Sequence, residues 1–495
     1  MELNSIEYKS GANRLTERIT TECKSTVSVE QVKKVLCVTP LVTIVESTVN
    51  ENQIEYGGRA TFYINYIDSE NNLKKCECGA EFNGKIKSQT DITSAFGVCR
   101  AVKTNTDLSG AFLSVNCTVE VCFETTTIKK SNLFFGEDGV ITNQVNIDIN
   151  KSYGIKKCLY PIEEQFDLNY QIEEVLSHKA ESVITAVQCG IGAIIVDGVT
   201  QVSAIVLQKT QKRDIIKIYK QIPFRVEIEH DDATPEMLSV ARVKEKSYKI
   251  DIAVDEETST STVTANVTLA FEGEVFSTPE TSVVVDAFSP DYNLELLREE
   301  IVYNKQIEVK SFTHGATIES QVELQPTAKI IATADEKVEE LVCSYIDGEI
   351  KVTGVIGATC YALDNQTVTT FKVEGAFEKT MEVALPDGVI ISAVAKVFDC
   401  KVKLSGENQV ETSAEIYFTV YPEEVKKQTV ICGVNTLSEK QKNQSAISVY
   451  IPFEGEELWS IAKRLGVCPE TVAQTNKDLV FPLTGKERIV IYRQK

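Results

Sequence analysis

The sequence is poor in several residue types that mark common classes of protein. Its 495 residues include three His, three Met and one Trp, and its 14 Cys form no Cys-x-x-Cys pair. Zinc sites usually draw their ligands from closely spaced Cys and His pairs, so no metal site is expected. Cysteines scattered in this way predict reduced, small core residues rather than a disulfide framework.

Long apolar runs are also missing. Residues 1–10 contain no basic segment followed by an apolar one, which predicts that the chain is not secreted. No apolar run approaches the roughly 20 residues that span a bilayer, so no transmembrane segment is predicted. The expected location is therefore cytoplasmic.

Basic residues are outnumbered, and the formal net charge is −21. From Ile447 onward there are seven Lys or Arg and six Asp or Glu, which leaves 44 basic and 66 acidic residues before it. Such an acidic body repels nucleic acid and anionic membranes, so no nucleic-acid partner is expected. The hydrophobic fraction of 43% is sufficient for folded cores, and the length predicts about three or four domains.

No catalytic motif is recognisable. His178, His230 and His314 lie outside the motifs that give histidine a catalytic role, and the first two are expected to be solvated among charged neighbours. The glycine-rich segment 189–195 imitates a dinucleotide loop but leads into β-branched residues, so it predicts a turn. The acidic cluster 229–232 lacks the spacing of a calcium loop. We therefore expect a protein that is not an enzyme and has no cofactor.

Three stretches alternate strictly between apolar and other residues, and each predicts a strand with one buried face. They are residues 113–123, 263–271 and 414–420. Each is preceded by the same two landmarks, which are a glycine that opens a β-branched or aromatic run and a return strand that carries a phenylalanine. The landmark glycines are Gly58, Gly198 and Gly354, and the landmark phenylalanines are Phe82, Phe224 and Phe377.

These landmarks indicate one unit that occurs three times. The copies start about 150 residues apart, which is the period of a domain rather than of a solenoid repeat. Short strands without a helix between consecutive strands exclude a parallel α/β sheet and favour antiparallel sandwiches. The predicted fold is therefore mainly β, with tandem antiparallel β-sandwich-like repeats.

Changes in composition set the predicted domain boundaries. The expected parts are a polar, loosely ordered N-terminal segment (1–25), three repeats (26–160, 161–300 and 301–422) and a polar linker (423–446). Helical spacing at each junction between repeats also predicts a short covering helix. The residues with this spacing are Ile172, Val175 and Leu176 at the first junction and Leu294, Leu297 and Ile301 at the second.

The last segment, 447–495, has a different pattern. Leu458, Ile461, Ala462 and Leu465 follow helical spacing, so a helix is predicted from about residue 456 to 465, ending at Gly466. A second helix is predicted over 469–476, because it begins with a proline. Strand-type residues at 447–451 and 488–492 flank the pair. The predicted order is strand, helix, helix, strand.

This order, together with a Gly-acidic turn and the run Leu-Trp-Ser-Ile-Ala at 458–462, resembles the LysM module. That module is a βααβ fold that generally binds N-acetylglucosamine-containing glycans such as peptidoglycan. The resemblance implies that the loops after the first strand and before the second contact the ligand. The candidate binding residues are Gly455, Glu456, Glu457, Trp459, Asn476, Lys477, Pro482 and Gly485.

Both loops depart from the usual LysM pattern. Gly455, Glu456 and Glu457 stand where the family has Gly-Asp-Thr or Gly-Asp-Ser, so a second carboxylate replaces a small hydroxyl at a helix start, where acids are favourable. In the second loop, two residues separate Pro482 from Gly485, whereas LysM modules normally have a Pro and a Gly next to each other. Two functions remain open, namely a weak sugar site and a LysM fold that grips a protein. Adjacent glutamates cannot flank a glycosidic bond, which ranks a glycosidase last.

Three acidic β-repeats ahead of a LysM module resemble the SPOCS-domain proteins of endospore-forming clostridia, in particular spore-coat morphogenetic proteins of the SipL type. The resemblance implies a non-enzymatic scaffold in the mother-cell cytoplasm at the forespore surface. Proteins of that family engage the coat ATPase SpoIVA, and the LysM module is implicated in the contact. The alternative function is a cell-wall protein that binds peptidoglycan. Exposed sheet edges offer a further mode of protein contact.

Overall fold

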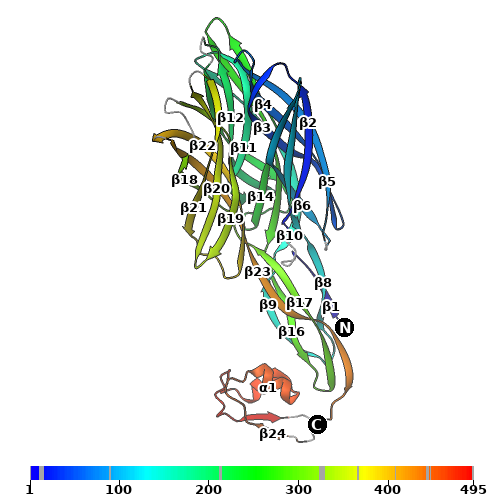
Figure 1. Ribbon diagram of the computed structural model, residues 1–495. Helices are drawn as coiled ribbons and strands as arrows, with labels where there is room; N and C mark the ends of the chain where they lie inside the picture. The colour runs from blue at the N-terminus through cyan, green and yellow to red at the C-terminus, as the bar shows by residue number, and fades with distance from the viewer. Residues whose placement is uncertain are drawn as a thin grey trace.

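The fold, shown by a computed structural model, consists almost entirely of antiparallel β-strands (Figure 1). The structure describes residues 2–9, 16–88, 91–210, 214–322, 329–364, 367–406, 408–441, 445 and 447–492. The mainly β, antiparallel class predicted from the sequence is confirmed. The strands form three sandwiches, a narrower stalk below them and a small C-terminal module.

Sandwich 1 has two three-stranded sheets, β2-β7-β6 and β3-β4-β5. Its strands are β2 (Thr16–Ser28), β3 (Val32–Asn50), β4 (Gln53–Asp68), β5 (Leu73–Lys87), β6 (Ser94–Ser109) and β7 (Phe112–Thr126). Ile54 and Phe62 of one sheet and Val119 of the other are completely buried in the shared core. Since neighbouring residues of a strand point to opposite faces, alternate apolar residues are sufficient to build this core.

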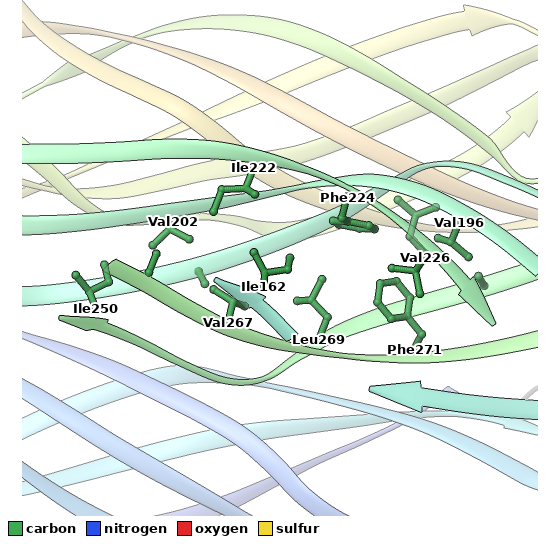
Figure 2. Close-up of a cluster of buried hydrophobic side chains, with 14 of the residues drawn as sticks. Ile162, Val196, Val202, Ile222, Phe224, Val226, Ile250, Val267, Leu269 and Phe271 are labelled. Atoms are coloured by element: carbon green, nitrogen blue, oxygen red, sulfur yellow. The ribbon is translucent and has the colours of Figure 1, made fainter. Parts of the chain in front are cut away.

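Sandwiches 2 and 3 repeat the topology of sandwich 1. Sandwich 2 contains β10 (Lys151–Leu168), β11 (Ile172–Cys189), β12 (Ala193–Gln208), β13 (Ile215–Glu229), β14 (Leu238–Asp255) and β15 (Thr260–Ser277). Sandwich 3 contains β18 (Lys310–Gln321), β19 (Lys329–Ile346), β20 (Glu349–Asp364), β21 (Thr367–Glu382), β22 (Val389–Gly406) and the first part of β23 (Gln409–Glu439). In sandwich 2, Phe224 and Phe271 pack between the sheets with their ring centroids 5.6 Å apart (Figure 2).

The predicted alternating strands are confirmed as β7, β15 and the start of β23. Each is the central strand of a three-stranded sheet. Their inward-facing side chains, among them Phe123, Phe271 and Phe418, are almost completely inaccessible to solvent. The strict alternation therefore marks one of the two central strands of each repeat, the one that is buried on a single face along its length.

The landmark glycines and phenylalanines lie opposite one another on neighbouring strands. The pairs are Gly58–Phe82, Gly198–Phe224 and Gly354–Phe377. A Cβ atom added to Gly198 would lie 2.2 Å from Cζ of Phe224 and 2.4 Å from the carbonyl oxygen of Val183. Each glycine therefore leaves the space that the phenylalanine ring fills.

The stalk consists of three two-stranded ribbons, one from each repeat. The pairs are β1 (Glu2–Lys9) with β8 (Ile128–Gly136), β9 (Ile141–Asp148) with β16 (Glu280–Phe288), and β17 (Tyr292–Gln306) with the second part of β23. The strand that enters each sandwich thus pairs with the strand that leaves it. Figure 1 shows the ribbons together below the sandwiches, and Val283, Ile301 and Val430 are buried among them.

The three sandwiches meet at a shared cluster, here called the hub, which contains Leu36, Ile205 and Tyr361 from sandwiches 1, 2 and 3 respectively. Asn65 of sandwich 1 donates a hydrogen bond to the hydroxyl of Tyr361 at 2.9 Å. Beside it, Lys217 of sandwich 2 forms an ion pair with Glu336 of sandwich 3. The body above the stalk is therefore held together by apolar, hydrogen-bonded and ionic contacts.

The predicted covering helices at the two junctions are wrong. Residues 172–176 belong to β11, and residues 294–301 belong to β17. The pairing of β11 shifts between Ile172 and Glu174, where β11 has an extra residue. At the shift between Leu297 and Arg298 of β17, the extra residue lies in its partner β23. A β-bulge adds one residue to a strand and changes the phase of its side chains. In β11 the apolar residues therefore recur at intervals that imitate a helix, whereas in β17 the imitation arises because Leu297 is an exposed apolar residue.

The expectations for the polar segments 1–25 and 423–446 are also wrong where the structure describes them. Residues 2–9 form β1 and residues 16–25 lie in β2, whereas 10–15 are outside the described residues. Residues 423–439 continue β23, and 442–444 and 446 are outside the described residues. A stalk strand exposes one face to water, so its composition resembles that of a linker although its other face is buried.

The repeats consequently begin and end elsewhere than predicted. With their stalk ribbons included, they run from β1 to β8, from β9 to β16 and from β17 to β23. The predicted boundary between 160 and 161 falls inside β10, and the one between 300 and 301 falls inside β17. Composition could not locate these boundaries, because the two strands of each stalk ribbon are separated in the sequence by the whole sandwich.

Candidate binding surfaces of the C-terminal module

The C-terminal module, residues 447–492, has the order strand, helix, helix, strand. Its elements are β24 (Ile447–Tyr450), α1 (Leu458–Leu465), α2 (Pro469–Thr475) and β25 (Ile489–Tyr492). The two helices predicted in this segment are confirmed, and β24 pairs antiparallel with β25. Gly466 ends α1 in the left-handed conformation, with φ of 62°, as glycine permits without strain.

Helix α1 packs its apolar side on the sheet and fastens the module to the stalk. The indole nitrogen of Trp459 donates a hydrogen bond to Oδ2 of Asp286 in β16 at 2.8 Å. Lys463, one turn later, places Nζ 2.6 Å from the same oxygen. The ring of Trp459 also packs edge-on against Phe288, with centroids 5.2 Å apart. Phe288 thereby joins the core of the module, next to Ile461.

Asp286 is the common partner in this docking contact. Burial opposes its ionisation, but hydrogen bonds from Lys463 and Trp459 outweigh that effect and hold the pKa of the carboxyl below its ordinary value. Arg298 adds an ion pair at 3.1 Å. Trp459, a predicted binding residue, therefore faces the stalk. Its partner precedes it by 173 residues, so no local pattern in the sequence points to this contact.

Glu456 and Glu457 have different surroundings although they are adjacent. Glu456 accepts hydrogen bonds from the hydroxyl of Tyr450 and the backbone N–H of Phe453, both at 2.9 Å, and forms an ion pair with Arg464 at 2.8 Å. It therefore ties the first loop to β24 and α1. Glu457 is the N-cap residue of α1, makes no side-chain capping bond and is exposed. Only Glu457 is free to meet a ligand.

In the second loop, Asn476 joins α2 to β25. Its amide nitrogen donates to the carbonyl oxygens of Val472 and Val490, and its amide oxygen accepts from the N–H of Val490, all at 2.8 Å. These hydrogen bonds give Asn476 a structural role that does not require a ligand. Lys477 and Pro482, in contrast, are exposed.

The two loops contact each other directly. The N–H of Gly455 donates to the carbonyl oxygen of Leu483 at 2.7 Å, and Glu454 and Thr484 form a β-bridge. Gly485 has φ of +82°, and a Cβ there would lie 3.0 Å from the nitrogen of Glu454, so a side chain is excluded at this position. The contact brings Gly455 and Gly485 together. We call three exposed side chains of these loops that were predicted as binding residues, Glu457, Lys477 and Pro482, the loop surface.

A second surface, which was not predicted from the sequence, lies on the sheet. Residues Ile447, Val449, Ile451 and Tyr492 are 56–67% exposed, whereas the ring of Phe453 lies against Arg464 of α1. The register pairs Ile447 with Tyr492 and Val449 with Val490, so these side chains share the side of the sheet that faces away from the helices. We call this set, together with Val490, the outer face. The alternation of apolar residues at 447, 449 and 451 could have indicated it.

Elsewhere the histidine predictions need correction. His230 is completely buried, with Nε2 3.2 Å from the carbonyl oxygen of Gly154. Its acidic neighbour Glu229 points outward, because adjacent residues of an extended chain face opposite sides. His178 is half-buried between Tyr63 and Tyr248, and burial lowers the pKa of its imidazole to about 4. The ring is therefore neutral at pH 7.

The glycine-rich segment 189–195 turns between β11 and β12, as predicted, with Gly192 at φ of +74°. All 14 cysteines are free thiols, four of them buried and ten half-buried. Burial raises the pKa of the Cys23 thiol to about 12. Within the described part of the chain, no three His, Cys, Asp or Glu side chains gather as metal ligands, and no helix is long and apolar enough to cross a membrane.

Comparison with known proteins yields no relative: no protein-family model, curated protein or solved structure matches this chain. The fold and the site therefore define the class. It is a mainly β protein in which three antiparallel sandwiches stand on a shared stalk, and a strand–helix–helix–strand module is docked at the end of that stalk.

Proposed function

We propose that this chain is a non-enzymatic scaffold that helps to assemble the spore coat at the forespore surface, in the mother-cell cytoplasm. It acts through protein–protein contacts of its C-terminal module, taken as a LysM module, and of its SPOCS-type repeats. One observation carries the proposal: α1 fixes the module to the stalk through Trp459 and Asp286 while the loop surface remains exposed. A module held in one orientation loses little freedom when it binds a partner.

The resemblance of the sequence to the SipL type supports a SpoIVA-like coat ATPase as the partner. The loop surface presents a carboxylate at Glu457 and an ammonium at Lys477, both exposed. Charged side chains of this kind select a partner by complementarity more than they add affinity. The acidic repeats supply additional sheet surface for other coat proteins.

The alternative function, binding of peptidoglycan, is favoured by the direct contact between the two loops, Gly455 to Leu483. Two features count against it. Glu457 replaces the small hydroxyl that LysM modules usually carry, and the ring of Trp459 is engaged with Phe288. The part of this ring that contacts Phe288 is not available to a sugar.

The test uses the full chain, because Phe288 of the stalk belongs to the core of the module. Binding is measured to a purified SpoIVA-like ATPase and, separately, to muramyl glycan. We expect binding to the ATPase, and we expect Glu457→Ala combined with Lys477→Ala to weaken it by about fivefold or more. Gln474→Ala, an exposed change on α2, is the matched control and should leave the affinity unchanged.

Binding to glycan without binding to the ATPase would replace the first function by the alternative. Equal affinities of the double variant and the control would refute the assignment of the loop surface. Trp459→Ala is unsuitable for this test, because it removes the hydrogen bond to Asp286 and the packing on Phe288. A loss of binding in that variant would report the orientation of the module.

A further inference from the structure

We propose that the outer face of the C-terminal module joins two copies of this chain end to end, with their bodies on opposite sides of the contact. This contact is separate from the loop surface that is assigned to the coat ATPase. It rests on the composition of the outer face, on its direction and on the distribution of charge along the chain.

The side chains that make up the outer face are apolar. Its members Ile447, Val449, Ile451 and Tyr492 are each more than half exposed. They lie on two neighbouring strands and on the extended residues that follow β24, so they form one surface. Single apolar side chains on a surface are common, whereas a contiguous apolar group marks an interaction site.

The outer face points away from the rest of the protein. Helix α1 lies between the sheet of the module and the end of the stalk, as its contacts with Asp286 and Phe288 show (Figure 1). A second copy that stacks on the outer face therefore projects its own body in the opposite direction. Such a contact is symmetric, because each copy presents the same surface.

The distribution of charge favours this arrangement over any side-by-side dimer. The residues before Ile447 include 44 basic and 66 acidic ones, whereas those from Ile447 onward include seven and six. Two stacked sheets lie about 10 Å apart, and on each side one helix about 10 Å thick separates the sheet from its stalk. The ends of the two acidic stalks are therefore about 30 Å apart. That separation is several times the Debye length of about 8 Å at physiological salt, so the repulsion is screened.

The contact is small, so the association is expected to be weak and dependent on concentration. Sedimentation of the full chain over a range of concentrations should show a monomer–dimer equilibrium. The change Val449→Glu places one carboxylate of each copy in the contact. Burial there removes the water that hydrates the carboxylate, so the dissociation constant should rise at least about tenfold. Ile451→Lys, which introduces the opposite charge, should have the same effect.

Ile191→Glu is the matched control, because Ile191 is 90% exposed in the turn between β11 and β12, far from the module in the sequence. It should leave the dimer unchanged. All three variants change exposed positions, and an unaltered unfolding midpoint verifies their folding. In X-ray scattering, the longest dimension of the dimer should approach twice that of the monomer. Higher salt should preserve or strengthen the dimer, since it screens the acidic bodies.

Four outcomes would overturn the inference. They are a monomer at every concentration, a dimer that survives Val449→Glu, a dimer no longer than the monomer, and a dimer that high salt disrupts. A further contrary result is a monomeric chain in which Val449→Glu abolishes binding to the ATPase, because the outer face would then belong to that partner. Failure here leaves the function of the loop surface standing, since that function is measured with the other variants.

Discussion

The packing of each repeat depends on one strand position that has no side chain, and Gly198 is that position in sandwich 2. Glycine usually weakens a strand, because it adds no packing and loses more freedom on folding. Here its hydrogen faces the ring of Phe224, which covers the strand and packs on Phe271 across the sandwich. The same arrangement recurs at Gly58 and Gly354, so the glycine and the phenylalanine form one packing motif.

We predict that Gly198→Ala destabilises the protein by about 2 kcal/mol or more, because the new methyl group would overlap both a ring and a backbone carbonyl. The measurement is the free energy of unfolding in urea. Gly315→Ala, in a strand where nothing lies within 4 Å of the added carbon, is the control and should change stability far less. Equal effects of the two changes would show that the ring does not need this space.

At the same scale, sequence reasoning found the landmark residues but not their pairing. Gly198 and Phe224 stood out because a glycine and a phenylalanine recur in the same order, 23 to 26 residues apart, in three copies. That they lie opposite each other depends on the register of two strands, which is fixed by the whole sheet. The environments of His230 and Trp459 were also missed, since each is determined by residues far away in the chain.

Among the elements, α1 was predicted with nearly correct bounds, whereas β11 and β17 were misread at their starts. The apolar residues of α1 contact one another within two turns, so their spacing alone defines the helix. The start of β11 contains bulges and that of β17 pairs with bulges of β23, and neither feature is visible until the partner strand is known. Local pattern therefore suffices for a short amphipathic helix and fails for a long irregular strand.

The docking of α1 on β16 should depend on pH. Because the folded protein lowers the pKa of Asp286, docking is fully stabilised above the unfolded pKa of about 3.9 and weakens as the pH falls through the folded value. Trp459 is the only tryptophan, so its fluorescence reports the contact directly. We expect its emission to shift to longer wavelength upon acidification, below about pH 4.

Asp286→Asn should produce the shifted emission already at pH 7 and remove most of the acid transition, since it removes the ion pairs with Lys463 and Arg298. Asp478→Asn, at an exposed carboxylate of the same module, should behave like the original protein. An acid transition that persists unchanged in Asp286→Asn would assign the pH dependence to another group.

For the molecule as a whole, the hub makes the three sandwiches depend on one another. Leu36, Ile67 and Leu73 of sandwich 1 are buried in the hub together with residues of the other two sandwiches. Asn65 and Tyr361 add a buried hydrogen bond between sandwiches 1 and 3. The repeats are therefore parts of one body and differ from independently folded domains on a string.

We predict that residues 1–136 alone, which include β1 to β8, unfold at a clearly lower temperature than the full chain. Without their partners, the three hub side chains of sandwich 1 face water, which costs about 1–2 kcal/mol for each apolar side chain. Calorimetry of the fragment and the full chain provides the measurement. An identical midpoint for both would mean that the hub contributes nothing to the stability of sandwich 1.

The uninterrupted course of β23 has a mechanical consequence. This strand leaves sandwich 3, runs the length of the stalk beside β17 and ends where the chain enters the C-terminal module. A pull on the module along the stalk acts lengthwise on the ladder between these two strands. Many hydrogen bonds then share the load at once, so tension applied at the tip is carried into the body without peeling the strands apart one bond at a time.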